Sequence, residues 1–178
     1  GIISGILKSN GDRVKAGESI IILDSETEKN NLELIRNRIK TQESQVELDR
    51  YSIRESELRL DNKKRLLESS RELLKNGAET SRNLDDLETD VMLLDAGLLK
   101  SRASLSISDS KLRELRTELR KAQIDLDRRN LTAPVDGTVL NIMVTTGSSI
   151  SQFSEFCEFA PDGNTIALYL RRPAEVPD

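Results

Sequence analysis

The chain has 178 residues, of which 33% are charged and only 3% aromatic, so its composition is unlike that of a compact globular core. Its net charge of -4 comes from interspersed acids and bases and offers no basic patch for nucleic acid. The sequence has no His, the usual general base and a common metal ligand. We therefore expect an elongated protein that is not an enzyme and uses no catalytic, metal-binding or cofactor-binding residues.

Residues 1–24 are typical of short strands joined by glycine turns, with Gly11 and Gly17 at the turns. The longest strongly apolar run, Ile20–Leu23, is far shorter than the roughly 20 residues that a membrane span needs. Gly1 stands in the middle of what resembles a strand. We therefore expect the chain to belong to a longer protein, with any membrane anchor outside it.

Residues 25–130 contain no Pro, and their apolar residues recur every seven positions, which predicts two long coiled-coil helices. The two main columns are Leu32, Ile39, Val46, Ile53, Leu60, Leu67 and Leu74, and then Leu84, Val91, Leu98, Leu105, Leu112, Leu119 and Leu126. In the second helix, a companion column lies three residues after the main one. It holds Leu87, Leu94, Leu115 and Ala122 and is interrupted by Ser101 and Ser108.

The two columns mirror each other about position 79, which predicts that the chain folds back there into an antiparallel helical hairpin. Its tip lies at about residues 76–81, where Gly77 can end the first helix and Thr80 or Ser81 can cap the second. The companion column of the first helix is polar after Ile35. We therefore expect that flank to stay solvated or to meet a neighbouring chain.

Residues 131–172 complete the pattern of the first 24. Residues 1–14 and 137–150 match at a constant offset of 136, pairing Ile3 with Val139 and Gly11 with Gly147. Halves of this size cannot bury a face alone, so we expect them to pack on each other. The predicted fold is α+β, with a long hairpin inserted into a split β-domain. The lone Cys157 lies among three Phe residues and is interpreted as a buried packing thiol.

Two further segments carry a specific resemblance. Gly11–Glu18 followed by Ile20–Asp24 resembles the first half-motif of the biotinyl/lipoyl domains of membrane fusion proteins, and Leu131–Val139 with Gly147 resembles the second. The resemblance covers essentially the whole chain and implies a periplasmic adaptor. In that family residues 173–178 would lead out toward a β-barrel domain, and the inner-membrane anchor would lie in a segment outside this chain.

The resemblance also implies partners. They are an inner-membrane transporter, either an ABC or a proton-driven one, an outer-membrane channel and further copies of the adaptor in a ring. The resemblance places channel docking at the hairpin tip. Relatives dock through an Arg, a Leu and a Ser at fixed spacing. Here Ser69 stands at the Arg position, with Arg71 two residues further on. The other tip positions are Leu73, Gly77, Thr80, Ser81, Leu84 and Asp85.

Two alternative functions are open. A biotin or lipoyl carrier domain of a transferase complex would need a modified Lys between the half-motifs, where the hairpin is inserted. Lys29 is the nearest candidate, although it lacks the flanking carrier signature and is interpreted as a solvated charge. The other alternative is a coiled-coil scaffold unrelated to transport.

Overall fold

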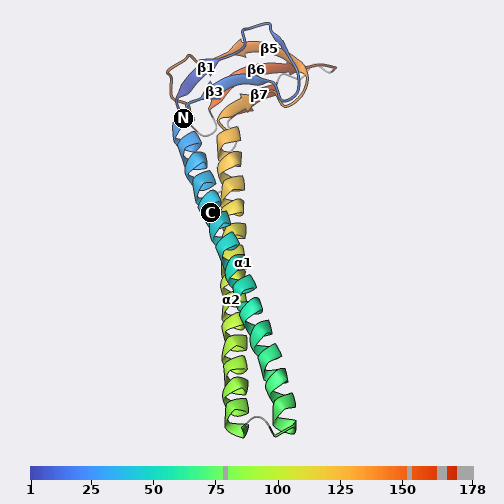
Figure 1. The fold of residues 1–178 in the computed structure, drawn as a ribbon. Helices are drawn as coiled ribbons and strands as arrows, with labels where there is room; N and C mark the ends of the chain where they lie inside the picture. Colours follow the sequence, from blue (N-terminus) through green and yellow to red (C-terminus); the bar gives the residue numbers. More distant parts are fainter. Residues whose placement is uncertain (78–79, 152–153, 164–167, 172–178) are drawn as a thin grey trace. The chain divides into compact units, whose positions relative to one another are not determined.

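The computed structural model of the chain divides into two compact units (Figure 1). One unit combines Gly1–Glu33 with Arg120–Asp178 and holds all of the strands. The other, Leu34–Leu119, holds most of both helices. The residues that the structure describes are 1–77, 80–151, 154–163 and 168–171. The predicted exit toward a β-barrel at residues 173–178 lies outside them.

The strands of the first unit form two antiparallel sheets. The smaller sheet has the order β1-β3-β4 and the larger has the order β2-β5-β6-β7. The smaller sheet consists of β1 (Ile3–Ile6), β3 (Ser19–Leu23) and β4 (Asn130–Thr132). The larger consists of β2 (Arg13–Val14), β5 (Gly137–Ile142), β6 (Glu155–Pro161) and β7 (Leu168–Arg171). Each sheet therefore contains strands from both ends of the chain.

The repeated halves of this β-domain are intertwined. The Gly147 amide donates to the Ile3 carbonyl at 2.9 Å, and the Gly11 amide donates to the Val139 carbonyl at 2.7 Å. These two bonds are equivalent under the offset of 136, and both glycines have positive φ, 93° for Gly11 and 84° for Gly147. Each half thus pairs its strand with the turn of the other half, as the prediction that they pack together requires.

The core of the β-domain is apolar and comes from both halves. Gly137 lies against β6 so closely that a Cβ atom there would be 2.3 Å from the Ala160 carbonyl oxygen and 2.5 Å from Phe159 Cζ. Cys157 is fully buried beside these residues, as expected for a packing thiol. The buried cluster is Ile3, Val14, Ile20, Ile21, Leu23, Leu131, Ala133, Val139, Ile150, Phe156, Cys157 and Phe159.

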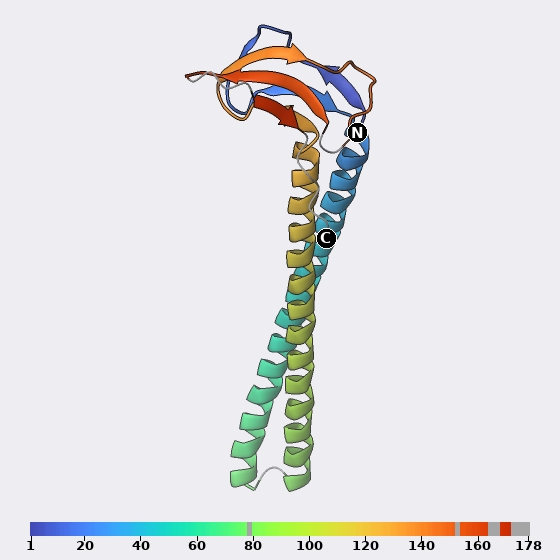
Figure 2. The same cartoon turned by 180° about the vertical axis from the view of Figure 1, so that it is seen from behind.

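Helices α1 (Glu26–Lys75) and α2 (Ser81–Asp127) pair antiparallel within the second unit, where they lie side by side in Figures 1 and 2. Ion pairs join the helices at matching distances from position 79. Among them are Arg116 with Glu43 at 3.0 Å, Arg102 with Glu57 at 3.0 Å, and Arg71 with Glu88 at 2.9 Å. The predicted α+β fold, with an antiparallel hairpin inserted into a split β-domain, is confirmed. In the described part of the chain neither helix is long and apolar enough to cross a membrane.

The polar column of α1 differs from expectation. Asp49 and Ser70 are only 8% and 3% exposed, so this flank faces α2 instead of solvent. The Asp49 carboxylate accepts hydrogen bonds from Ser108 Oγ at 2.5 Å and from Ser104 Oγ at 3.4 Å. A buried carboxylate is tolerated because hydroxyl donors on the opposite helix stand at the same height.

Candidate functional site

The hairpin tip is the site that the resemblance to membrane fusion proteins implies. Helix α1 ends at Lys75, and the next amides turn back on the helix. The Asn76 amide donates to the Leu73 carbonyl at 3.1 Å, and the Gly77 amide donates to the Leu74 carbonyl at 3.0 Å. Gly77 has a φ of 73°, the left-handed conformation common just after a helix end. Gly77 is therefore the helix stop that the sequence predicts.

The start of α2 settles which hydroxyl is the cap. Thr80 Oγ1 accepts a hydrogen bond from the Asn83 amide at 3.4 Å, and the Thr80 carbonyl accepts the Leu84 amide at 3.3 Å. Ser81 is the first helical residue. Thr80 is thus the N-cap, while the Ser81 hydroxyl remains exposed at the helix start.

The predicted docking residues differ in their accessibility. Gly77, Thr80, Ser81 and Asp85 are exposed, and Leu84 is half-buried. Leu73 is 45% exposed, so it is not covered by the hairpin seam that its neighbour Leu74 joins. Among the predicted docking residues, Leu73 is therefore an exposed large apolar side chain, near the small exposed residues Gly77, Thr80 and Ser81 and the charged Asp85. Residues 78 and 79 between the two helices lie outside the described part of the chain.

The basic residue nearest the tip pattern is engaged within the hairpin. Ser69, at the position where the resemblance implies an Arg, is exposed. Arg71 donates to Glu88 across the hairpin at 2.9 Å and also lies 3.6 Å from Glu68. The hydrogen bond to Glu88 raises the pKa of the Arg71 guanidinium, which stays protonated. Arg71 acts here as a brace between the helices close to the tip.

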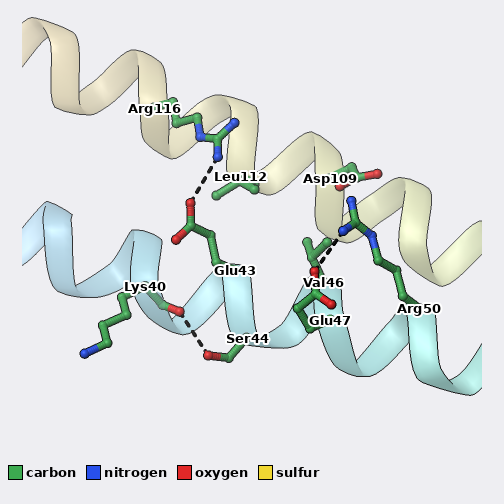
Figure 3. A pocket seen from close by; sticks show the side chains of 9 residues that line it. All are labelled: Lys40, Glu43, Ser44, Val46, Glu47, Arg50, Asp109, Leu112 and Arg116. Carbon is green, nitrogen blue, oxygen red and sulfur yellow. Dashed lines mark hydrogen bonds and ion pairs between the residues drawn. The ribbon is translucent and has the colours of Figure 1, made fainter.

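A groove of about 530 Å³ lies between the helices further from the tip (Figure 3). Arg116 donates to Glu43 at 3.0 Å, and Arg50 pairs with Glu47 at 2.8 Å. Because the guanidinium groups are matched by carboxylates, the groove has no net preference for an anionic or cationic ligand. Its lining residues are Lys40, Glu43, Ser44, Val46, Glu47, Arg50, Asp109, Leu112 and Arg116.

The remaining chemical candidates lie in or beside the β-domain. Lys29 is exposed in the first turn of α1, where its amide donates to the Ser25 carbonyl at 3.0 Å. Burial raises the pKa of the Cys157 thiol to about 11, and the Glu158 charge adds to this rise. Within the described ranges there is no group of three or more His, Cys, Asp or Glu side chains placed to hold a metal ion.

Comparison with known proteins was informative only at the level of structure. No family model and no curated protein sequence matches the chain. The crystal structure of MacA from Actinobacillus actinomycetemcomitans matches with a TM-score of 0.62 at 20% identity, covering 98% of this chain and 46% of MacA. This chain shares the fold of MacA. It spans less than half of MacA's length.

Two other solved structures match less well. One is the soluble domain of LipC, a membrane fusion protein of a type I secretion system, with 17% identity, coverage of 98% of this chain and 96% of that chain, and a TM-score of 0.46. The other is a MacA-MexA chimera that contains the Pseudomonas aeruginosa MexA α-hairpin domain. It has 19% identity, coverage of 90% of this chain and 44% of that chain, and a TM-score of 0.48. The match with MacA confirms the resemblance inferred from the two half-motifs at the level of the fold.

The sequence period predicted where the two helices turn back but missed one polar cluster. The buried Asp49 and Ser108 form a hydrogen-bonded pair in the middle of the seam, to which the exposed Ser104 adds a second donor. The signal was present in the sequence, because Ser108 interrupts an apolar column and stands opposite Asp49 when the chain is folded about position 79.

Proposed function

We propose that the chain is the lipoyl-and-hairpin part of a periplasmic adaptor that links an inner-membrane transporter to an outer-membrane channel, for efflux or protein secretion. The observation that carries this proposal is the insertion of an antiparallel hairpin into a split, repeat-built β-domain, a fold shared with MacA over 98% of the chain. An adaptor of this kind acts by binding and geometry and catalyses no reaction.

The β-domain supports a structural role instead of a carrier role. Carrier domains display a modified Lys on the turn between their half-motifs, the point at which α1 and α2 leave this domain. Lys29 lies on a helix, with its backbone fixed in the first turn. Intact-mass analysis after expression with lipoate and biotin ligases tests this point, and an added cofactor mass would favour the carrier function.

In the proposal the tip contacts the channel through Leu73, Gly77, Thr80, Ser81, Leu84 and Asp85. An exposed Leu beside small hydroxyl-bearing residues suits docking between helix ends, because it can insert into an apolar gap without burying an unpaired charge. The domain order, the periplasmic location, the ring of adaptors and an anchor outside this chain belong to the same proposal.

The test is photo-crosslinking of the protein in its own host, with benzoyl-phenylalanine placed at Leu73. Leu66 is the matched control, since it stands one heptad further from the tip and is 52% exposed, compared with 45% for Leu73. We expect mass spectrometry to identify an outer-membrane channel in the adduct from position 73 only. Adducts from position 73 that contain no channel protein would refute tip docking.

A substitution complements the crosslink. Ser81→Arg places a bulky charge at the tip without removing the Thr80 cap or the seam residue Leu84. We expect loss of the adduct at position 73 and an unchanged helical circular dichroism signal. If the adduct at position 73 persists while the circular dichroism signal is unchanged, the tip surface is not the contact.

A further inference from the structure

The sequence contains two Asn-Gly dipeptides, Asn10–Gly11 and Asn76–Gly77. An asparagine followed by glycine is especially prone to spontaneous loss of its side-chain amide, because glycine has no Cβ atom to hinder attack by its backbone nitrogen. Both asparagines are exposed, and both glycines have positive φ, 93° for Gly11 and 73° for Gly77. The two sites are therefore alike in sequence, exposure and backbone conformation, and they differ in what holds them in place.

The first dipeptide is held by the other half of the β-domain. The Asn10 side chain donates to Asn141 Oδ1 at 3.3 Å and accepts the Ile142 amide at 2.9 Å. The Gly11 amide, which would have to attack the Asn10 side chain, donates to the Val139 carbonyl at 2.7 Å. The side chain and the attacking nitrogen are therefore both released only when the two halves of the β-domain separate.

The second dipeptide is held only by the last turn of its own helix. The Gly77 amide donates to the Leu74 carbonyl at 3.0 Å, and the Asn76 amide donates to the Leu73 carbonyl at 3.1 Å. Within the described part of the chain, no hydrogen bond engages the Asn76 side chain. Helix ends open at a small fraction of the free energy of global unfolding. The Gly77 nitrogen is therefore released far more often than the Gly11 nitrogen.

We propose that Asn76 is a site of spontaneous deamidation, which alters the hairpin tip with time while Asn10 stays intact. The Gly77 nitrogen loses its proton to solvent and forms a bond to Cγ of Asn76, and the side-chain nitrogen leaves as ammonia. The resulting succinimide ring then takes up one water molecule. Hydrolysis at one ring carbonyl gives aspartate, and hydrolysis at the other gives isoaspartate. Water is the only co-reactant.

Both products change the end of α1. The new carboxylate lies at the helix C-terminus, where the helix dipole disfavours an anion, although the adjacent Lys75 offsets part of the charge. Isoaspartate also adds a carbon atom to the main chain, which alters the spacing on which the bond from Gly77 to Leu74 depends. Leu73 belongs to the same turn, so we expect channel docking to weaken. This consequence rests on the proposed function, whereas the deamidation does not.

The test follows both sites in the same protein by peptide mass spectrometry. The 178-residue chain is incubated at mildly alkaline pH and then cleaved after glutamate at mildly acidic pH, which suppresses further ring closure during digestion. Cleavage places Asn10 in residues 1–18 and Asn76 in residues 73–79. We expect deamidation at Asn76 to be at least about tenfold faster, since a difference of about 1.4 kcal/mol in opening free energy gives this ratio.

Two controls separate the effect of the fold from local chemistry. In the chain unfolded in urea, the two Asn-Gly sites should react at similar rates. In Asn76→Gln the side-chain amide is one methylene further away, so ring closure is far slower and the 73–79 peptide should stay unchanged. An equal or faster reaction at Asn10 in the folded chain would overturn the proposal. So would the absence of reaction at Asn76 over a period in which the unfolded chain reacts at both sites.

The consequence for docking is tested in the host with the crosslink at Leu73. Asn76→Asp supplies the charge of the product, and Asn76→Gln is the matched neutral control. We expect the channel adduct to decrease in Asn76→Asp and to persist in Asn76→Gln. Equal adducts from the two variants would refute the effect on docking alone. Absence of the channel adduct from the protein with the native Asn76 would refute the proposed function, and the deamidation measured on the purified chain is independent of both results.

Discussion

Gly137 is the position where one added methyl group should destabilise the β-domain most. A Cβ atom there would be 2.3 Å from the Ala160 carbonyl oxygen, 2.5 Å from Phe159 Cζ and 2.9 Å from the Pro161 Cα atom. Two of these three neighbours are backbone atoms of β6, which cannot move aside by changing a rotamer. We therefore expect Gly137→Ala to reach the upper end of the usual cost of overpacking, about 3 kcal/mol or more.

The buried thiol of Cys157 provides the assay, because it lies in β6, the strand that a Cβ at Gly137 would meet, and should react only when the β-domain opens. A loss of about 3 kcal/mol should speed its labelling by a thiol reagent roughly 100-fold in the regime where opening is a rapid equilibrium. Gly5→Ala is the control, since a Cβ at Gly5 would have nothing within 4 Å. If both variants label at the same rate, the close approach of Gly137 to β6 is not real.

Three further predictions concern the seam, the tip and the thiol. Asp49→Leu combined with Ser108→Ala should raise the free energy of unfolding of the hairpin by about 1–3 kcal/mol, because a buried polar pair is replaced by apolar packing. The urea midpoint measured by circular dichroism should rise accordingly, and a lower midpoint would contradict this. Arg71→Ala should lower the thermal unfolding midpoint only slightly, and less at high salt, because the pair with Glu88 is exposed, so a large drop in the midpoint would show that the brace is more than a surface ion pair. Since the pKa of Cys157 is raised from 9.0 to about 11, the folded chain retains the thiol proton where the unfolded chain loses it, and stability should fall as the pH rises through this interval. The urea midpoint should therefore drop more steeply with pH than in Cys157→Ala, and equal slopes would refute the shift.

Much of the fold could be predicted because the buried residues recur at a fixed spacing in the sequence. The two seven-residue columns fix which side of each helix is apolar, and their mirror about position 79 fixes the pairing that the Arg71–Glu88 and Arg102–Glu57 bridges display. The offset of 136 similarly identified equivalent glycine turns at Gly11 and Gly147. Patterns of this kind are visible in the sequence alone and do not require knowing which side chains face each other in the fold.

The features that could not be predicted depend on contacts with other parts of the fold or with a partner. Asp49 belongs to a column that we expected to be solvated or shared with a neighbouring chain, but Ser104 and Ser108 stand at its height and make its burial possible. The choice between Thr80 and Ser81 as the cap could not be made in advance, because both offer a hydroxyl one residue apart. Channel docking by the tip stays a prediction, since it concerns a surface that only a partner can define.

The exchange of strands and turns between the two halves has a consequence for the order of folding. The turn of the first half, at Gly11, is completed by Val139, and the strand at Ile3 is completed by Gly147. These bonds between the halves cannot form until the second half has been synthesised, more than a hundred residues later. Closing so long a loop is entropically costly unless the intervening chain is already compact. We therefore expect the hairpin, whose contacts begin close to its tip, to fold before the β-domain, and pulse-labelling hydrogen exchange that protects the strands first would contradict this order.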